Sequence, residues 1–265
     1  MTPDHLPLAL AAGLLGLPAG SFLNVVAHRV PRGESLLFPA SRCPHCGAGV
    51  RARHNVPVLG WLLLRGRCAD CRAPIGAHYP LVELATAVLF AAVALRLGPT
   101  AALPAYLYLA AVAVPLTVID LRVRRLPNTI VLPSYPVCGA LLLAASAAGG
   151  DPRAMLRALA AMAAVGACYL LLYRLYPGGM GAGDVKLSGL LGLCLGWLGW
   201  SQVAVGILGG FLLGGVIGVL LLASGRAGRR SAMPFGPSML AGALLAVLAA
   251  GPVADWYRSL FPSLT

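Results

Sequence analysis

Residues 202–223, QVAVGILGGFLLGGVIGVLLLA, contain no charged side chain over 22 positions. A helix needs about 20 apolar residues to cross the hydrocarbon core of a bilayer. The run therefore predicts a membrane-spanning helix. Its many glycines favour close packing against other helices, because small residues let helix backbones approach one another in lipid.

The whole chain has the same character. Of its 265 residues, 59% are hydrophobic and 11% are charged, and the mean hydropathy is +0.84. Soluble domains carry about 25% charged residues. The chain is therefore predicted to be an all-α polytopic membrane protein with about eight transmembrane helices. The apolar runs lie near 6–27, 79–97, 100–120, 128–149, 154–176, 185–200, 202–223 and 235–256, and the sixth is short and rich in glycine.

The basic residues predict how the chain crosses the membrane. When loops are assigned alternately to two sides, one side receives 16 of the 20 Lys and Arg residues. Because positive residues stay cytoplasmic, both termini are expected outside the cytoplasm. The net charge of +12 is then a matter of topology, and no nucleic-acid partner is needed to explain it. The first run lacks a preceding basic segment and is expected to be a retained span, not a cleaved signal peptide.

Three segments follow from this topology. Residues 1–29 form the first transmembrane span, residues 30–78 form a cytoplasmic insert, and residues 79–265 form a transmembrane core. The insert is rich in Arg, Pro, Cys, His and Gly, and the other loops are short. The fold class is thus a helical membrane bundle with one small cytoplasmic zinc-binding insert.

Four cysteines in the insert are the candidate zinc ligands. They form two CxxC units, Cys43–Cys46 and Cys68–Cys71. Four thiolates bind zinc tetrahedrally, whereas disulfides are disfavoured in the cytoplasm. A four-cysteine site has no open coordination position, so the zinc is expected to be structural. Unligated thiols, or His45 as a competing ligand, are the alternatives. The remaining cysteines, Cys138, Cys168 and Cys194, are expected to be small packing residues.

Three of the eight acidic residues lie at or inside predicted spans: Glu83, Asp120 and Asp184. Asp120 and Asp184 are both expected at the cytoplasmic edge of the membrane. Taken singly, each is an interfacial acid, and Asp184 would favour a helix start. Taken together, two neighbouring carboxylates share a proton, so one activates a water while the other polarises a peptide carbonyl. Glycines beside them would let a substrate backbone approach.

The motifs around these residues resemble the prepilin peptidase, or type IV leader peptidase, family. GAGDVKL at 181–187 resembles the GxGD motif of intramembrane aspartyl proteases. The other matching stretches, in order along the chain, are GSFLNVVAHRVP at 20–31, SRCPHCGAGV at 41–50, the segment 55–87, DLRVRRLPNTIVLP at 120–133 and PFGPSMLAGA at 234–243.

The resemblance implies a membrane aspartic endopeptidase of the bacterial cytoplasmic (inner) membrane. It implies removal of the leader peptide from prepilins and pseudopilins at the cytoplasmic face, commonly just after a Gly. Many members then methylate the new N-terminal amine with S-adenosylmethionine, an activity associated with the cysteine-containing portion. No fingerprint in the sequence places the S-adenosylmethionine site.

Residue roles follow from the same resemblance. Asp120 and Asp184 are the expected catalytic pair, and Gly181 and Gly183 shape the loop. The zinc ligands are the four cysteines of the insert. Lys186 either tunes the pair or faces lipid headgroups. Glu83 either serves methylation or substrate binding, or is a buried acid that pairs helices.

Two other classes of protein were weighed. An ion-coupled transporter also uses intramembrane acids, but these usually lie near the bilayer midplane within inverted repeats. Here both acids lie at segment ends, and no repeat is evident in the sequence. A membrane scaffold could use the zinc module to bind a partner. Neither class predicts paired acids and glycines together.

Overall fold

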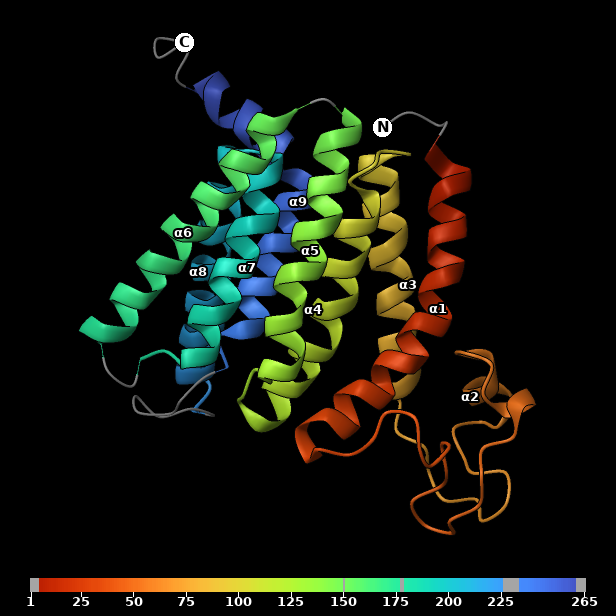
Figure 1. Ribbon diagram of the computed structural model, residues 1–265. Helices are drawn as coiled ribbons and strands as arrows, with labels where there is room; N and C mark the ends of the chain where they lie inside the picture. The colour runs from red at the N-terminus through yellow and green to blue at the C-terminus, as the bar shows by residue number, and fades with distance from the viewer. Residues whose placement is uncertain (1–4, 150, 177–178, 226–233, 261–265) are drawn as a thin grey trace. The chain divides into compact units, whose positions relative to one another are not determined.

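The computed structural model describes residues 5–149, 151–176, 179–225 and 234–260, and for 251–260 only the helical backbone. Within these ranges the chain is helical and forms no strand (Figure 1). The elements in order are α1 (Leu6–Arg29), η2 (Val30–Arg32), η3 (Ala52–His54), α2 (Leu59–Leu63), α3 (His78–Leu97), α4 (Leu103–Val123), α5 (Asn128–Gly149), α6 (Pro152–Leu175), α7 (Ala182–Leu198), α8 (Trp200–Ala223) and α9 (Gly236–Leu260).

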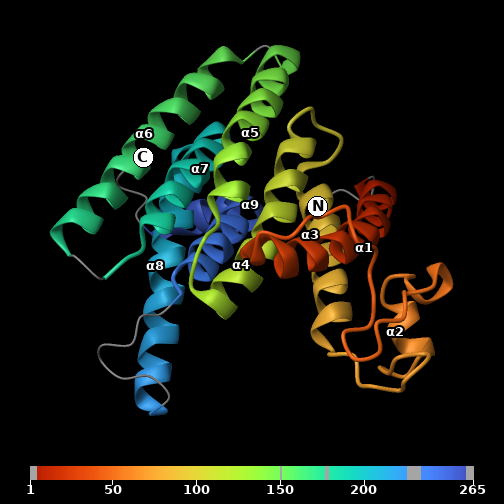
Figure 2. The same cartoon turned by 60° about the horizontal axis from the view of Figure 1, so that its bottom comes forward.

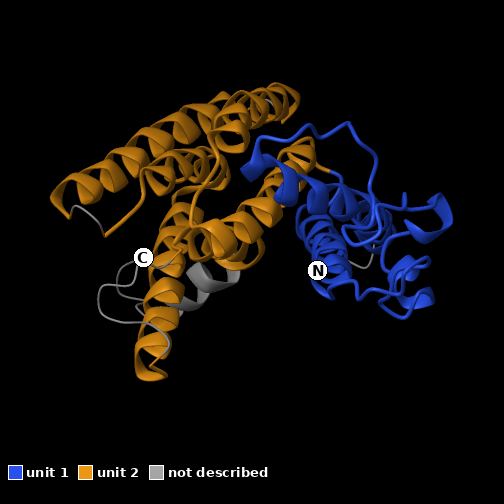
Figure 3. Ribbon diagram, turned by 90° about the horizontal axis from the view of Figure 1, so that it is seen from below, with its two compact units in different colours: residues 1–99 blue, residues 100–265 orange. Residues whose placement is uncertain are grey.

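The chain divides into two compact units, residues 1–99 and residues 100–265 (Figure 3). The first unit holds α1, α2, α3 and the loops that carry the four cysteines of the insert. The second unit holds the six helices from α4 to α9.

In the first unit, α1 and α3 lie side by side (Figures 1 and 2). Two glycines of α1 make this contact close. A Cβ atom at Gly16 would lie 2.6 Å from the Cα of Ala87, and one at Gly20 would lie 2.7 Å from the Cα of Glu83. No side chain fits at either position without separating the helices. The close approach places the start of α3, with Glu83, against α1.

In the second unit, α7 is the central helix and contacts all of the other five. Its residues from Leu187 to Gly196 are all buried. At Gly192 and Gly196, α6 approaches so closely that a Cβ atom would collide with Ala161. The short, glycine-rich sixth run is therefore an internal helix, which explains why it is less typical of a lipid-facing span.

Two glycines of the run 202–223, Gly206 and Gly210, lie where α8 meets α9. A Cβ atom at Gly242 of α9 would collide with the backbone of Gly206 and Gly210 of α8. The opposite side of α8 is exposed, with Leu212, Val219 and Leu220 on its surface, so one face packs on α9 and the other is apolar and uncovered.

Among the residues that the structure describes, six helices are long and apolar enough to cross a membrane: α1, α3, α4, α5, α6 and α8. Helix α7 has 17 residues, and the described apolar part of α9 is Gly236–Ala250. Each of the eight predicted apolar runs thus corresponds to one helix. The predicted fold class, an all-helical multi-pass membrane protein, is confirmed.

The isolated cysteines do not all pack in the core as expected. Cys138 and Cys194 are buried in the second unit, but Cys168 of α6 is exposed. The prediction that all three are packing residues is wrong for Cys168, because the outward face of α6 is uncovered by the described chain.

Candidate active site and metal site

Asp120 lies in the last turn of α4, and its side chain is only 4% exposed. Its Oδ2 accepts a hydrogen bond from the backbone N–H of Gly236, at the start of α9, at 3.1 Å. Arg124, in the left-handed conformation, ends the helix and donates its backbone N–H to the Asp120 carbonyl at 2.9 Å. The carboxylate is thus held at a helix end by a residue 116 positions away.

Asp184 lies in the first turn of α7 and is 7% exposed. Its Oδ2 accepts the backbone N–H of Gly181 at 2.9 Å, and its own N–H donates to the Gly181 carbonyl at 3.0 Å. A carboxylate at this position satisfies a free helix N–H and interacts favourably with the helix dipole. Asp184 is therefore a helix-start acid, but this role engages only one of its two oxygens.

The surroundings of the two carboxylates share one neighbour, Leu126. A Cβ atom built on Gly183 would lie 3.0 Å from the Cβ of Leu126, and one built on Gly236 would lie 3.2 Å from a Cδ atom of the same leucine. One leucine thus touches the loop before Asp184 and the glycine that holds Asp120.

The glycines around the pair have different roles. A Cβ atom at Gly236 would lie 2.7 Å from Asp120 Oδ2, and one at Gly181 would lie 3.2 Å from Asp184 Oδ2. Gly183 instead makes room for Leu126. Gly236 was not among the predicted site residues. Its only sequence signal is its place in PFGPSMLAGA, which contributed to the resemblance without indicating a contact with Asp120.

Lys186 does not form an ion pair with either acid. Its Nζ donates to Asn128 Oδ1 at 3.0 Å, and its backbone carbonyl accepts a hydrogen bond from the hydroxyl of Tyr135. In the described parts of the chain the only salt bridge lies elsewhere, between Arg51 and Asp70. The structure places Lys186 as a link between α7 and α5.

The Sγ atoms of Cys43, Cys46, Cys68 and Cys71 all lie within 4.8 Å of one another. The Cys43–Cys71 and Cys46–Cys68 sulfur distances are 3.8 Å and 4.0 Å. Four sulfurs about 2.3 Å from a tetrahedral zinc would lie about 3.8 Å apart. A disulfide needs about 2.05 Å. The group has the shape of a metal site, and it does not include His45, which is exposed.

The two CxxC units have matching backbones. In the first, Cys43 N–H donates to Ala48 O and Gly47 N–H donates to Cys43 O; the second repeats this pattern with Cys68, Ala73 and Arg72. The residue after each second cysteine has positive φ, 71° at Gly47 and 62° at Arg72. The same turn therefore presents each cysteine pair.

The backbone around the second CxxC pair, Cys68 and Cys71, also affects the protonation of its thiols. Hydrogen bonds from the backbone of Cys71 and Asp70 lower the pKa of the Cys68 thiol to about 7, although burial opposes them. The thiolate is the form that binds metal, so the backbone of this turn favours ligation by Cys68, whereas burial and the neighbouring thiols raise the pKa of Cys71 to about 12.

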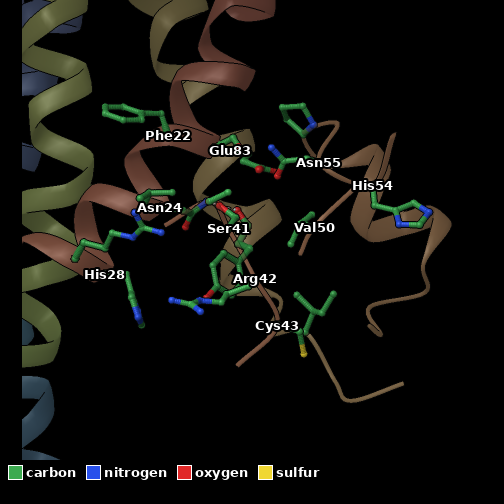
Figure 4. Close-up of a pocket in the computed structure, with 18 of the residues that line it drawn as sticks. Phe22, Asn24, His28, Ser41, Arg42, Cys43, Val50, His54, Asn55 and Glu83 are labelled. Atoms are coloured by element: carbon green, nitrogen blue, oxygen red, sulfur yellow. Dashed lines mark hydrogen bonds between the residues drawn. The ribbon is translucent and has the colours of Figure 1, made fainter. Parts of the chain in front are cut away.

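The first unit also contains a cavity of about 1210 Å³, lined by α1, the cysteine loop, α2 and α3 (Figure 4). Glu83 lies in its wall and is 8% exposed. Its Oε2 accepts the backbone N–H of Val58 at 2.7 Å. Asn24, also in the wall, donates to the Tyr79 carbonyl at 3.1 Å. Glu83 lies where α3 packs against α1, as a helix-pairing acid would. Its carboxylate, however, bonds the loop at Val58 and lines the cavity.

These features define a multi-pass helical membrane protein with two buried carboxylates at helix ends and a group of four cysteines that could hold a metal ion. Two family models match the chain: Bacterial Peptidase A24 N-terminal domain over residues 14–97, and Type IV leader peptidase family over residues 106–219. The chain belongs to the type IV leader peptidase family.

Curated relatives agree with this assignment and share the name Prepilin leader peptidase/N-methyltransferase. The protein from Aeromonas hydrophila is 37% identical over 94% of this chain and 93% of its own length. The one from Burkholderia pseudomallei is 37% identical over 91% and 84%. The one from Myxococcus xanthus is 40% identical over 87% and 70%. No solved structure matches the chain.

Proposed function

We propose that this chain is a membrane aspartic endopeptidase that removes the leader from prepilins or pseudopilins and then methylates the new N-terminal amine. The observation that carries the peptidase is the placement of Asp120 and Asp184 at buried helix ends that share Leu126 as a neighbour, each with one oxygen bonded to a glycine N–H. The names of the relatives support both activities. The bacterial inner membrane, with cleavage at its cytoplasmic face, is the location that fits such substrates.

The chemistry follows from one protonated and one ionised carboxylate. The ionised acid takes a proton from a water molecule as the water oxygen attacks the carbonyl carbon of the scissile bond. The protonated acid transfers its proton to the carbonyl oxygen, which gives a tetrahedral gem-diol. Collapse of this species breaks the C–N bond, and the amine leaves with a proton from the acids. The products are the leader with a new carboxylate and the pilin with a new amine.

Gly181 and Gly236 position the two carboxylates. The bonds from Gly181 and Gly236 occupy the Oδ2 atoms and fix the orientation of both carboxylates. Preorganised groups of this kind need no rearrangement during the reaction. The missing side chains at both glycines leave room for the carboxylates themselves, because a Cβ atom at either position would crowd the Oδ2 atom.

We propose zinc as the ion of the four-cysteine group and a structural role for it. Support comes from the sulfur spacing and from the two matching turns. The loops contain little regular structure, with only η2, η3 and the short α2 between α1 and α3. Metal binding would therefore contribute directly to their folding.

The transporter alternative has less support. Transport acids are expected near the middle of broken helices, whereas Asp120 ends α4 and Asp184 begins α7. Each acid is also bonded to backbone at a helix end.

The proposed function is tested with purified full-length enzyme, a candidate prepilin and isotopically labelled S-adenosylmethionine. Mass spectrometry of the product should show loss of the leader and gain of one labelled methyl group. Intact prepilin after prolonged incubation with several prepilins and pseudopilins would contradict the peptidase. A cut but unmethylated product would contradict only the second activity.

A further inference from the structure

The cavity of the first unit is a feature that the proposed cleavage does not use. Its volume is about 1210 Å³, whereas small-molecule sites typically measure about 300–1000 Å³. It has room for a cofactor-sized molecule together with the end of a peptide chain. All the residues that line it belong to residues 18–83.

A buried carboxylate without a cation lies in the wall. Glu83 forms no salt bridge, since the one ion pair in the described ranges joins Arg51 and Asp70. Its Oε1 has no hydrogen-bond partner in the described residues. Every fully buried side-chain oxygen in those residues does have a partner, so Oε1 is not fully buried. Because Glu83 lines the cavity, a ligand there can reach this oxygen. Buried charges are usually paired. A cationic ligand in the cavity would supply the missing partner.

The loop that Glu83 holds is strained. Val58 has φ 61° and ψ −53°, and the N–H of Leu59 donates to the Pro57 carbonyl at 2.6 Å. This is a classic γ-turn, a rare and strained form, with a β-branched residue at its centre. Such strain persists only where the surroundings enforce it, and it clusters at ligand clamps. Here the enforcing contact is the bond from Val58 N–H to Glu83.

The rest of the wall suits a large molecule that carries charges of both signs. Aromatic side chains, an exposed acid and arginines also line the cavity; they are Phe22, Trp61, Tyr79, Glu34, Arg29 and Arg42. The Arg29 guanidinium is already engaged, because it donates to the carbonyls of Ser35 and Pro39 at 2.8 Å and 2.6 Å. Arg42 remains as a charged group at the cavity (Figure 4).

S-adenosylmethionine matches this set. It has an aromatic base, ribose hydroxyls, a carboxylate, and two positive centres, the sulfonium and the ammonium groups. We propose that this cavity binds S-adenosylmethionine, with Glu83 facing its positive end. The inference rests on the proposed methylation, and it adds where the methyl donor binds and that Glu83 contacts it. When bound, the molecule supplies the methyl group, and the chain's own residues orient it and hold the γ-turn.

Binding is measured by titrating S-adenosylmethionine into the purified full-length enzyme without any pilin, so that the readout does not depend on activity. Glu83→Gln removes the charge but keeps an oxygen for the Val58 N–H. It should weaken binding by about tenfold or more, the range for loss of a charge-assisted hydrogen bond. Asp151→Asn is the control for the loss of one negative charge, since Asp151 is exposed in the unit of residues 100–265 and Asn keeps the cap of α6; its affinity should stay within about twofold.

A second measurement covers the case in which Glu83→Gln disturbs the fold. Labelled S-adenosylmethionine is cross-linked to the wild-type protein by ultraviolet light, and the labelled peptide is sequenced. The label should fall within residues 18–83. A label in residues 100–265, or equal affinity of Glu83→Gln and wild type, would overturn the inference.

The outcomes separate this inference from the function on which it rests. Asp184→Asn should lose cleavage and bind S-adenosylmethionine like the wild type. If the enzyme methylates but Glu83→Gln binds normally and fails only in transfer, Glu83 acts on the acceptor and the inference fails alone. If the wild type neither binds the donor nor methylates, the proposed methylation fails with it. Phospholipid headgroups that displace the donor completely would assign the cavity to lipid and overturn the inference.

Discussion

Each of the two buried acids keeps one oxygen bonded to a backbone N–H, and this single contact fixes the direction of the other oxygen. For Asp184 the donor is Gly181, three positions earlier, and for Asp120 it is Gly236, far along the chain. Helix capping and the proposed catalysis therefore do not compete at Asp184. The capping bond takes Oδ2 and sets the rotamer from which Oδ1 can act.

Gly236→Ala should impair cleavage. The new Cβ atom would lie 2.7 Å from Asp120 Oδ2, so either the carboxylate or the start of α9 must move. A displacement of about 1 Å in a catalytic group costs up to about a hundredfold in rate, and we expect a loss of about tenfold to a hundredfold in kcat. This loss is measured as the kcat of leader cleavage by the purified variant and the wild type.

Gly215→Ala on α8 is the matched control, because a Cβ atom there meets nothing within 4 Å. It should cleave at the wild-type rate. If Gly236→Ala retains full activity while remaining folded, Gly236 does not position Asp120.

The two cysteine turns show how much of a local structure a short motif determines. The CxxC spacing predicted that four sulfurs would converge, and they do. The repeated backbone bonds and the positive φ after each second cysteine were not anticipated. The first turn has Gly47 at that position, whereas the second has Arg72, a residue that is strained there.

Arg72→Gly should stabilise the metal-bound loops, and Gly47→Ala should destabilise them. A residue with a Cβ atom costs about 1 kcal/mol or more in the left-handed conformation, and Arg72 is exposed, so little packing is lost. The temperature at which zinc is released, followed with a colorimetric chelator, should rise for the first variant and fall for the second. The same sign for both changes would contradict the role of the turn.

Metal content tests the group as a whole. Purified protein should hold about one zinc per chain, and Cys43→Ser should lose it, because three thiolates bind more weakly than four. Methylation should suffer more than cleavage, since the carboxylate pair lies in the other unit. Elemental analysis measures the zinc, and Cys168→Ser is the control for removing an exposed thiol outside the group. Full zinc content in Cys43→Ser would remove Cys43 from the ligand set.

Sequence reasoning succeeded where a signal is local in the chain. Apolar runs gave the helices, and residue spacing gave the cysteine group. It failed where the answer depends on which helices touch. The contact between Gly236 and Asp120 needs the packing of α9 on α4, and the bond between Val58 and Glu83 needs the loop before α2 to fold onto α3. The internal position of α7 likewise follows from its neighbours and not from its own composition.

At the level of the full chain, the two proposed activities are assigned to two compact units. The unit of residues 1–99 holds the cysteine group and the cavity, and the unit of residues 100–265 holds the carboxylate pair. The two family matches, over residues 14–97 and 106–219, fall within the same two units. The proposed methyl transfer and cleavage should therefore be separable by substitution.

The central claim is that Asp120 and Asp184 act as one catalytic unit. The most direct measurement is leader cleavage by Asp120→Asn, Asp184→Asn and the double variant, each checked for fold and zinc content. Each single change should reduce kcat by about a thousandfold or more, and the double variant should be no worse, because residues that act as a unit fail together. The wild-type rate should follow a bell-shaped pH profile, since one acid must be protonated and the other ionised. A folded Asp184→Asn enzyme that cuts prepilin at a near-normal rate would contradict the account and leave Asp184 as a helix cap only.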